Sequence, residues 1–568
     1  MAKRIIAVVL ALVYSVLYAI VGPMIESQDL SFKRAYILPF TICLVLGIIF
    51  NLLIFSIIPN KKAVIQNSRI FQSFSKADKH ITKLLDSIGN RRFLFITWGF
   101  ILLAWIPVYL MVYPGVLSYD TLSQTGSALA TISSNHHPVL HTWLIRVFMR
   151  FGERMLGGYE YGIGVYSLVQ MIVLSYALAR LTVYLKKKKI ASIIVLIVAI
   201  GSALWFENAM LSVTMTKDVF HSAFLLLFVC HYTDIVSEPM EYVTKKSNLF
   251  IFPVVSFLMC AFRNNGIHIF IFCFAILLIL RIKSIKNIKK YLILIPVVLI
   301  PIVLFEIYSG PFFKVMGIQQ GEVRETLCVP IQQLQRVAVT RADELTEEQT
   351  DLMNYYIDNL NWREWKPGRE YDPFFADPAK SSFYSARYDE NPVAFWRFYL
   401  KTGKQFTKDY VVAFLSNTLG YWYPGYYGYS YVMYDNYDPE LFVVPLERKA
   451  VLNAEAITNF YKSMCLSDRW RDIYVVRLFF VPGFSAWLLI YSIIIAWKDK
   501  RFITKKLPMF LPMIAQFGIM LLSPMSSFRY SWPLYLMLPI VLIAVCGKKG
   551  EANEDKIQAN LGDINEGE

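Results

Sequence analysis

The chain has 568 residues, of which 56% are hydrophobic and only 17% are charged. Soluble globular proteins carry about 25% charged residues, so this composition excludes an ordinary soluble enzyme and indicates a polytopic membrane protein. The net charge is +15 at pH 7. Because the basic residues lie between apolar runs, they indicate membrane orientation rather than a nucleic-acid partner.

Apolar runs recur along the whole chain. A bilayer core of about 30 Å requires roughly 20 apolar residues per helix, so the sequence predicts an all-α polytopic fold with about twelve transmembrane helices. Two of them, the seventh and the eighth, are only half length. The predicted spans lie near residues 5–22, 35–58, 93–112, 159–185, 190–206, 219–236, 249–262, 267–280, 291–308, 474–497, 507–523 and 529–546.

The basic segments between these spans predict the orientation. The loop 59–92, KKKK at 186–189 and RIKSIKNIKK at 281–290 all fall on one side when the spans alternate from a cytoplasmic N-terminus. The positive-inside rule assigns this side to the cytoplasm. We therefore predict a protein of the bacterial cytoplasmic membrane with both termini in the cytoplasm and a first span retained as a signal anchor.

The chain divides into five predicted regions. They are an N-terminal two-helix hairpin with a basic loop (1–92), a transmembrane core (93–308), an external soluble domain (309–473), C-terminal transmembrane helices (474–549) and a disordered acidic tail (550–568). The cysteines show no metal-ligand spacing. Cys328 and Cys465 both fall in the hydrophilic external region, and the sequence leaves open whether they pair.

The first external loop, residues 113–158, is rich in polar residues. Asp120 is either the N-cap of a short helix or a carboxylate that accepts a proton from an acceptor hydroxyl. His136 and His137 are substrate-binding candidates, and with nearby carboxylates they are also candidates for a divalent metal site, since imidazole and carboxylate suit Mn or Zn. The second half of the loop, VLHTWLIRVFMRFGERM, predicts an amphipathic helix in the membrane interface.

Two further polar segments lie on the same predicted side. Lys217 and Asp218 begin the sixth span, where they either orient a substrate or stabilise a helix N-terminus capped by Thr216. Arg263 and Asn264 lie in FRNNG, between the two half-length spans. Arg263 either binds an anion, for which phosphate is a good bidentate match, or extends from a helix end towards the interface.

The C-terminal part adds two aromatic features. Arg529 and Tyr530 begin the last span in SSFRYSWPLY, where Arg529 is either a second phosphate ligand or an interface anchor. The Tyr- and Trp-rich run 421–439 suits either sugar stacking or an interfacial aromatic belt, and we expect the belt.

The order of these features resembles the GT-C glycosyltransferases, especially the glycosyltransferase family 39-like group that includes protein O-mannosyltransferases and lipid A aminoarabinose transferases. The resemblance rests on Asp120, on HPVLHTW and MRFG in the first loop, on TKD and RNNG, and on the Arg-Tyr and Pro of the last span. It covers roughly residues 93–308 and the last span. It implies an integral-membrane glycosyltransferase that moves a sugar from a polyprenyl-phosphate donor to a cell-envelope acceptor on the outer face.

The resemblance also implies roles for the candidate residues. The catalytic candidates are Asp120, as general base, and Asp218. The substrate-binding candidates are His136, His137, Lys217, Arg263, Asn264, Arg529 and Tyr530. The alternatives are a transporter or flippase for lipid-linked saccharides, a polymerase or ligase that uses the same lipid phosphate, and a scaffold based on the external domain.

Overall fold

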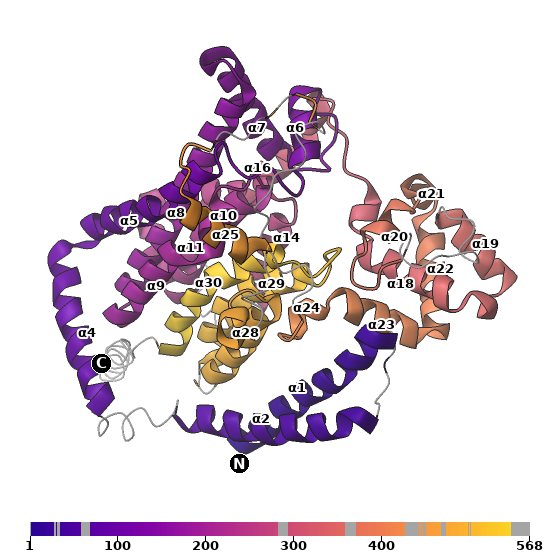
Figure 1. The fold of residues 1–568 in the computed structure, drawn as a ribbon, viewed down its shortest axis with the longest axis horizontal. Coiled ribbons are helices and arrows are strands. Elements are labelled where there is room, and N and C mark those ends of the chain that lie inside the picture. The colour runs from indigo at the N-terminus through magenta and orange to yellow at the C-terminus, as the bar shows by residue number, and fades with distance from the viewer. Residues whose placement is uncertain are drawn as a thin grey trace, which may run out of the picture.

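The computed structural model describes residues 2–27, 34–57, 69–281, 294–357, 371–426, 450–466, 473–497 and 501–546, together with residues 30, 442–444, 446 and 499. Of these residues, 81% are helical and none forms a β-strand (Figure 1). The all-α fold class predicted from the sequence is therefore confirmed. The predicted tail, residues 550–568, lies outside the described part of the chain.

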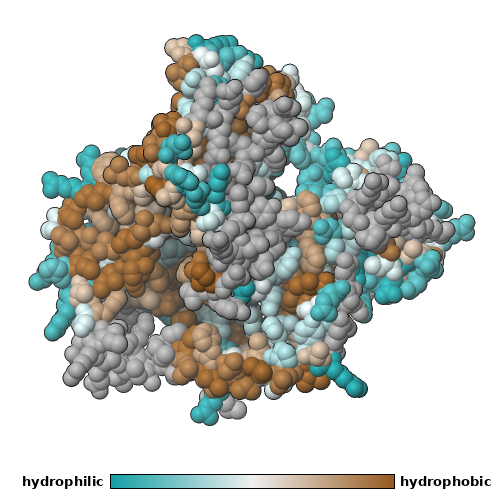
Figure 2. Space-filling view, viewed as in Figure 1, coloured by the Kyte–Doolittle hydropathy of each residue, from teal (hydrophilic) through white to brown (hydrophobic). Residues whose placement is uncertain are grey.

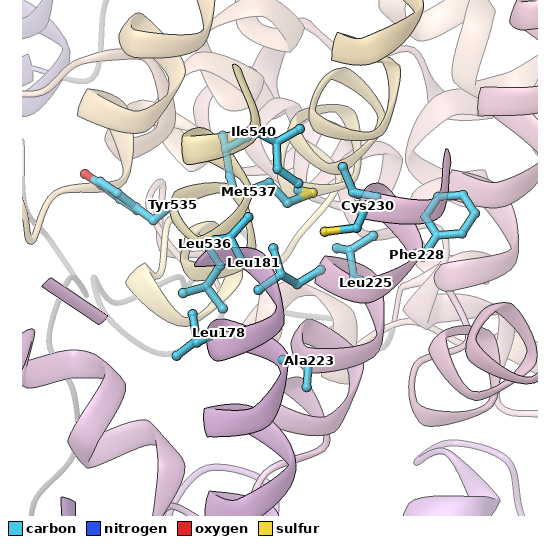
Figure 3. Packing of buried hydrophobic residues seen from close by; sticks show 14 of the residues in the cluster. Leu178, Leu181, Ala223, Leu225, Phe228, Cys230, Tyr535, Leu536, Met537 and Ile540 are labelled. Atoms are coloured by element: carbon cyan, nitrogen blue, oxygen red, sulfur yellow. The ribbon is translucent and has the colours of Figure 1, made fainter. Parts of the chain in front are cut away.

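The largest unit is a helical bundle. Its helices are α5 (Asn90–Met111), α8 (Tyr159–Lys187), α9 (Ser192–Leu204), α10 (Phe206–Ser212), α11 (Lys217–Ser237), α12 (Pro239–Thr244), α13 (Lys246–Phe262), α14 (Gly266–Arg281), α16 (Leu294–Ile307), α28 (Pro482–Ala496), α29 (Leu507–Met520) and α30 (Phe528–Cys546). Helices α8, α11 and α30 form its centre, where Leu181, Leu225 and Met537 meet in one apolar core (Figure 3). Because lipid is as apolar as these side chains, close van der Waals packing rather than transfer from water holds the three helices together.

The number of spans differs from the prediction. Within the described residues, seven helices are long and apolar enough to cross a membrane, or eight if the bent pair α9 and α10 forms one span. This pair bends by 50° where the sequence predicted one continuous span over 190–206. Three further apolar helices, α13, α14 and α28, are shorter than a full span. The described residues therefore confirm a multi-pass membrane protein, but they do not confirm about twelve helices.

The N-terminal helices lie at the edge of the bundle, and the last of them packs against α5 and α9. They are α1 (Ala2–Ser27), α2 (Ile37–Ile57) and α4 (Arg69–Ile88). Helices α1 and α2 pack on each other and lie along one side of the molecule (Figure 1). Only 6% of the apolar stretch of α2 is buried, against 72% of that of α11. Hydrophobic residues cover this pair in the space-filling view (Figure 2), as expected of a surface in contact with lipid.

The loop between α5 and α8 carries two short helices. They are α6 (Thr121–Leu129) and α7 (Val139–Phe151), followed by a π-helical turn, Gly152–Leu156. The amphipathic helix predicted from the sequence therefore exists. The MRFG glycine, Gly152, lies against the backbone of Gly162 at the start of α8, and neither position has room for a Cβ atom. This close approach fixes α7 against the bundle.

The region 309–473 contains the remaining helices. They are α17 (Phe313–Val315), α18 (Cys328–Thr340), α19 (Glu347–Tyr356), α20 (Asp377–Ser381), α21 (Ser385–Glu390), α22 (Pro392–Gln405), α23 (Thr407–Asn417), α24 (Leu419–Trp422) and α25 (Glu455–Leu466), and α27 (Tyr474–Leu478) follows directly. Helices α18 to α23 share an apolar core of their own, separate from that of the bundle. Cys328 is a buried free thiol of this unit, and the side chain of Cys465 lies outside the described residues.

Candidate active site

A short backbone pairing brings the two polar loops together. The Val116 N–H donates to the carbonyl of Val213 at 2.9 Å, and the Met215 N–H donates to the carbonyl of Val116 at 2.9 Å. The Thr121 hydroxyl, at the start of α6, donates to the carbonyl of Met215 at 2.8 Å. These bonds hold the segment that carries Asp120 beside the N-terminus of α11.

Asp218 lies in the first turn of α11 and is fully buried. Its carboxylate forms an ion pair with Arg263, and its Oδ2 lies 3.4 Å from Nε of Arg529. The Thr216 hydroxyl caps α11 and also donates to this carboxylate at 3.1 Å. The capped helix N-terminus is therefore present as predicted, and the Asp218 carboxylate also pairs with two arginines, while its role towards a substrate stays a prediction.

Asp120 is the N-cap residue of α6, but its side chain makes no capping hydrogen bond. The carboxylate instead lies 2.9 Å from Nζ of Lys217 and 3.4 Å from Nη1 of Arg529, with 27% of the side chain exposed. Burial alone would raise the pKa of this carboxyl, but Lys217 and Arg529 hold the pKa well below its usual range. Asp120 is therefore a charged, partly accessible carboxylate held by two cations.

The two arginines come from different ends of the chain. Arg263 is the C-cap residue of α13 and is 12% exposed, whereas Arg529 lies in the first turn of α30 and is 8% exposed. The ring of Tyr530 lies 5.1 Å from the Arg263 guanidinium and 4.8 Å from that of Arg529. The ring of Tyr119 packs on Arg529 at 4.4 Å. Such faces attract cations and keep the arginines in place.

These contacts define the charged cluster: Asp120, Lys217, Asp218, Arg263 and Arg529. Three cations face two carboxylates, so the cluster carries an excess of one positive charge. All five residues lie at helix termini or in the adjoining loop, at one end of the bundle. The four-lysine run 186–189 lies at the other end of α8 from the polar loop. Because of its excess positive charge, the cluster is chemically suited to an anion.

Tyr119 was not predicted from the sequence. Its φ of 60° lies in the left-handed region, which a bulky residue adopts only when its surroundings impose the conformation. This conformation directs the Tyr119 ring onto Arg529 and the next residue, Asp120, onto Lys217. No sequence pattern indicates such a backbone angle.

His137 contacts the charged cluster through Lys217. The ammonium group of Lys217 has no acceptor capacity, so His137 Nδ1, at 3.3 Å, accepts a hydrogen bond from it. The other ring nitrogen, Nε2, therefore carries the proton and donates to the Ser123 hydroxyl at 3.2 Å. Burial and the positive charge of Lys217 lower the pKa of His137 to about 3. His137 is thus a neutral residue that orients Lys217, and the ring of His136 lies edge-on to its ring with centroids 4.5 Å apart.

The described residues contain no group of three or more His, Cys, Asp or Glu side chains placed to hold a metal ion. His137 faces Lys217, and both carboxylates of the charged cluster face cations. The arrangement of these candidate ligands therefore does not support the predicted alternative of a divalent metal bound by His136 and His137 with the carboxylates.

A series of buried, hydrogen-bonded side chains, called the buried polar chain, joins the segments that carry the cluster. The Gln124 amide donates to His141 Nδ1 at 2.9 Å, His141 Nε2 donates to the Tyr166 hydroxyl at 2.6 Å, and Tyr166 donates to Gln170 Oε1 at 2.9 Å. The Gln170 amide then donates to the carbonyls of residues 212 and 214. Burial lowers the pKa of His141 to about 3, which keeps this ring neutral. The chain ties α6, α7 and α8 to the segment that precedes Lys217.

Tyr421, the first residue of the aromatic run 421–439, is not part of an interfacial belt as predicted for this run. Tyr421 is fully buried, and its hydroxyl donates to the carbonyl of Met525 at 2.7 Å and accepts from the Ser527 N–H at 3.2 Å. It therefore positions the turn that leads into Arg529. Residues 427–441 lie outside the described part of the chain.

The structure thus brings most of the predicted site residues together. Asp120, His137, Lys217, Asp218, Arg263, Arg529 and Tyr530 are linked by direct contacts. His136 borders this group through an edge-to-face ring contact with His137, and Asn264 borders it as the neighbour of Arg263 in the chain. Sequence reasoning did not identify Tyr119, Tyr421 or the buried polar chain.

Comparison with known proteins gives one match. A family model, described as a family of unknown function and named DUF6020, matches residues 127–559, which is most of the chain. The matched region includes four members of the charged cluster and begins after Asp120. No curated protein and no solved structure matches the chain. The protein therefore belongs to DUF6020, a family of unknown function.

Proposed function

We propose that this protein is an integral-membrane glycosyltransferase that moves a sugar from a polyprenyl-phosphate donor to a cell-envelope acceptor. The observation that carries the proposal is the charged cluster, in which a partly exposed carboxylate and three cations meet at one end of an apolar bundle. Buried or half-buried ionisable groups beside a bilayer are costly and usually functional.

The cations match the phosphate of the donor. Guanidinium groups bind phosphate oxygens in a bidentate geometry, and an ammonium group adds a point charge. Lys217, Arg263 and Arg529 supply both kinds. The lipid tail of the donor lies in the bilayer, so a phosphate site at the end of a membrane bundle has the required position.

Binding of the phosphate also explains how Asp120 becomes reactive. A carboxylate held by Lys217 and Arg529 is a weak base, because its proton-free form is strongly favoured. A phosphate that takes over these two cations weakens their hold on Asp120. The pKa of the carboxyl then rises towards its ordinary range, and Asp120 gains the basicity needed to accept a proton.

The transfer step then balances as follows. The bond between the anomeric carbon and the phosphate oxygen breaks, and the polyprenyl phosphate leaves with the electron pair. A bond forms between the anomeric carbon and the acceptor oxygen, whose proton passes to Asp120. The cations stabilise the charge on the departing phosphate, which is the electrostatic task of such a site. Inversion at the anomeric carbon is what the GT-C resemblance implies.

The topology proposed with this function puts the cluster on the outer face of a bacterial cytoplasmic membrane. The basic loops then lie in the cytoplasm with both termini, in accordance with the positive-inside rule. Residues 309–473 lie outside, where they lend selectivity for the acceptor. Tyr421, which belongs to this region, contacts the turn that precedes Arg529.

The position of the charges supports an enzyme over a transporter or flippase. A transporter requires a substrate site near the bilayer midplane, formed by broken helices of repeated halves. The charged cluster instead occupies helix ends on one side of the bundle. A polymerase or ligase uses the same lipid-phosphate chemistry and differs mainly in its acceptor.

A turnover assay tests the proposal. Purified protein in proteoliposomes receives a radiolabelled polyprenyl-phosphate sugar, and the release of polyprenyl phosphate is measured with an envelope extract as acceptor. We expect Asp120→Asn to bind the donor but to lose about 10²–10⁴-fold in turnover, the usual contribution of a general base. Asp343→Asn, at an exposed carboxylate of the external region, is the matched control. Turnover that is independent of Asp120 would contradict the assignment.

A further inference from the structure

Three chain segments meet beside the charged cluster. The Asn135 N–H donates to the carbonyl of Gln319 at 2.8 Å, and the Gln319 N–H donates to the carbonyl of Ser133 at 2.8 Å. The Asn264 side chain donates to the carbonyl of Asn135 at 3.1 Å. The first loop, the start of the external region and the turn between α13 and α14 therefore form one small surface.

Four polar side chains lie on this surface. We call Asn135, His136, Asn264 and Gln320 the amide cluster. His136 and Gln320 are exposed, Asn264 is half-buried, and the Asn135 amide donates to Gln320 Oε1 at 3.4 Å. Asn135 is 9% exposed, and its buried Oδ1 has no hydrogen-bond partner among the described residues. A buried acceptor without a donor is unusual in a folded protein and indicates a missing partner.

The amide cluster is continuous with the charged cluster. The ring of His136 makes an edge-to-face contact with that of His137, which accepts the hydrogen bond of Lys217. Asn264 directly follows Arg263 in the chain. A ligand held by the cations of the charged cluster therefore has the amide cluster as its immediate neighbour.

We propose that the amide cluster binds the hydroxyl groups of the donor's sugar, an inference that rests on the proposed function. Side-chain amides offer both donors and acceptors, and hydroxyl groups need both. A second phosphate would instead require cations. In a polyprenyl-phosphate sugar the sugar is bonded directly to the phosphate, so its hydroxyls must lie beside the phosphate site. An incoming hydroxyl also supplies the donor that Asn135 Oδ1 lacks.

An equilibrium binding experiment in detergent measures recognition of the phosphate and recognition of the sugar separately. The probes are polyprenyl phosphate and its glucosyl, mannosyl and arabinosyl esters, measured against wild type, Asn264→Ala and Gln320→Ala. The adjacent variants Asn265→Ala and Gln319→Ala are matched controls, because they remove exposed amides that lie outside the amide cluster. A melting curve for each variant reports whether it is folded.

We expect the wild type to bind one of the sugar esters more tightly than polyprenyl phosphate. In Asn264→Ala and Gln320→Ala this preference falls about three- to tenfold, the usual effect of one lost neutral hydrogen bond. We expect the affinity of these two variants for polyprenyl phosphate itself to stay unchanged. Both control variants should keep the affinity and the preference of wild type.

Three results would overturn the inference, and they are distinguishable. Equal binding of the sugar esters and polyprenyl phosphate by wild type shows that no sugar is recognised in the donor. An unchanged preference in folded variants shows that the amide cluster does not bind this sugar and leaves an acceptor glycan as its ligand. Wild type that binds none of the lipids removes the proposed function itself, and with it this inference.

Discussion

Two ion-pair clusters in this molecule differ in charge balance and in surroundings. In the predicted external region, Asp409 accepts hydrogen bonds from Arg336 Nε at 3.3 Å and from Arg341 Nε at 2.9 Å, and Arg341 also pairs with Glu344. We call these four residues the external group; its two arginines and two carboxylates balance, whereas the charged cluster has one positive charge in excess. The external group joins α18 to α23 beside a continuous apolar core. Ion pairing alone therefore does not identify a ligand site.

What distinguishes the charged cluster is its place in the fold. Its members come from loops and helix ends that are far apart in sequence, and two tyrosine rings face its arginines. Asp120 is 27% exposed, whereas Asp409 is 5% exposed. These differences support a role in folding for the external group, and they agree with the binding and catalytic role proposed for the charged cluster.

The largest predicted effect is a loss of folding free energy, and it is common to both clusters. Asp218→Ala leaves the buried Arg263 without its carboxylate, and Asp409→Ala does the same to the buried Arg336. Such a loss costs about 3–5 kcal/mol of folding free energy. Denaturant unfolding in detergent measures this loss. The two variants differ in ligand binding: the folded fraction of Asp409→Ala binds polyprenyl phosphate normally, and that of Asp218→Ala does not. Impaired binding by folded Asp409→Ala would remove the distinction between the clusters.

The next effect concerns the shape of the guanidinium. Arg529→Lys keeps the charge but loses the planar donors that reach Asp120, Asp218 and Tyr530. We expect polyprenyl-phosphate affinity to fall by about 1.5–3 kcal/mol, the contribution of a hydrogen bond to a charged group. Titration calorimetry measures the change, with Arg341→Lys as control. Equal affinities in wild type and Arg529→Lys would show that Arg529 is only an anchor.

The pH dependence of stability reports on His137. An unfolded histidine has a pKa of about 6.5, whereas His137 in the folded protein has a pKa of about 3. Between these values the unfolded state binds a proton that the folded state does not, so stability falls as the pH falls. The loss reaches about 2 kcal/mol at pH 5 relative to neutral pH.

The substitution His137→Asn isolates this contribution. Asparagine still offers an acceptor to Lys217 but does not titrate, so the variant should lose about 2 kcal/mol less than wild type between pH 7.5 and pH 5. Unfolding curves at the two pH values give the comparison, and the exposed His136→Asn serves as control. Identical pH slopes in wild type and His137→Asn would show that His137 is protonated in the folded protein.

The smallest effect is expected at the rim of the external group. Arg341 is 35% exposed, and Arg336 remains paired with Asp409 when Arg341 is removed. Exposed ion pairs contribute about 0–1 kcal/mol, so Arg341→Ala should lower the unfolding free energy by less than about 1 kcal/mol. A loss as large as that of Asp409→Ala would mean that the exposed arginine holds the external unit together.

The sequence predicted the features that local chemistry determines. The interfacial helix, the cap at Thr216 and the two short helices on either side of Arg263 all follow from periodicity and capping residues. The charged candidates were found because an ionisable residue beside an apolar run is conspicuous. Their location on one side of the membrane was predicted from the alternation of the spans.

The remaining features depend on contacts between distant segments. The bend at Trp205 has no proline or glycine to mark it, so the span over 190–206 looked continuous. Tyr421 looked like one more belt tyrosine, although it anchors a turn about 100 residues away. Gln170 gave the one usable signal, since a glutamine within an apolar helix requires a buried partner.

The most direct test of the account is thermal stabilisation by polyprenyl phosphate. A ligand that binds the folded protein raises its melting temperature by mass action. We predict that wild type and Arg341→Ala are stabilised equally and that Arg263→Ala, if it is folded, is not. The same stabilisation in all three proteins, or none in wild type, would contradict the assignment of the charged cluster as a lipid-phosphate site.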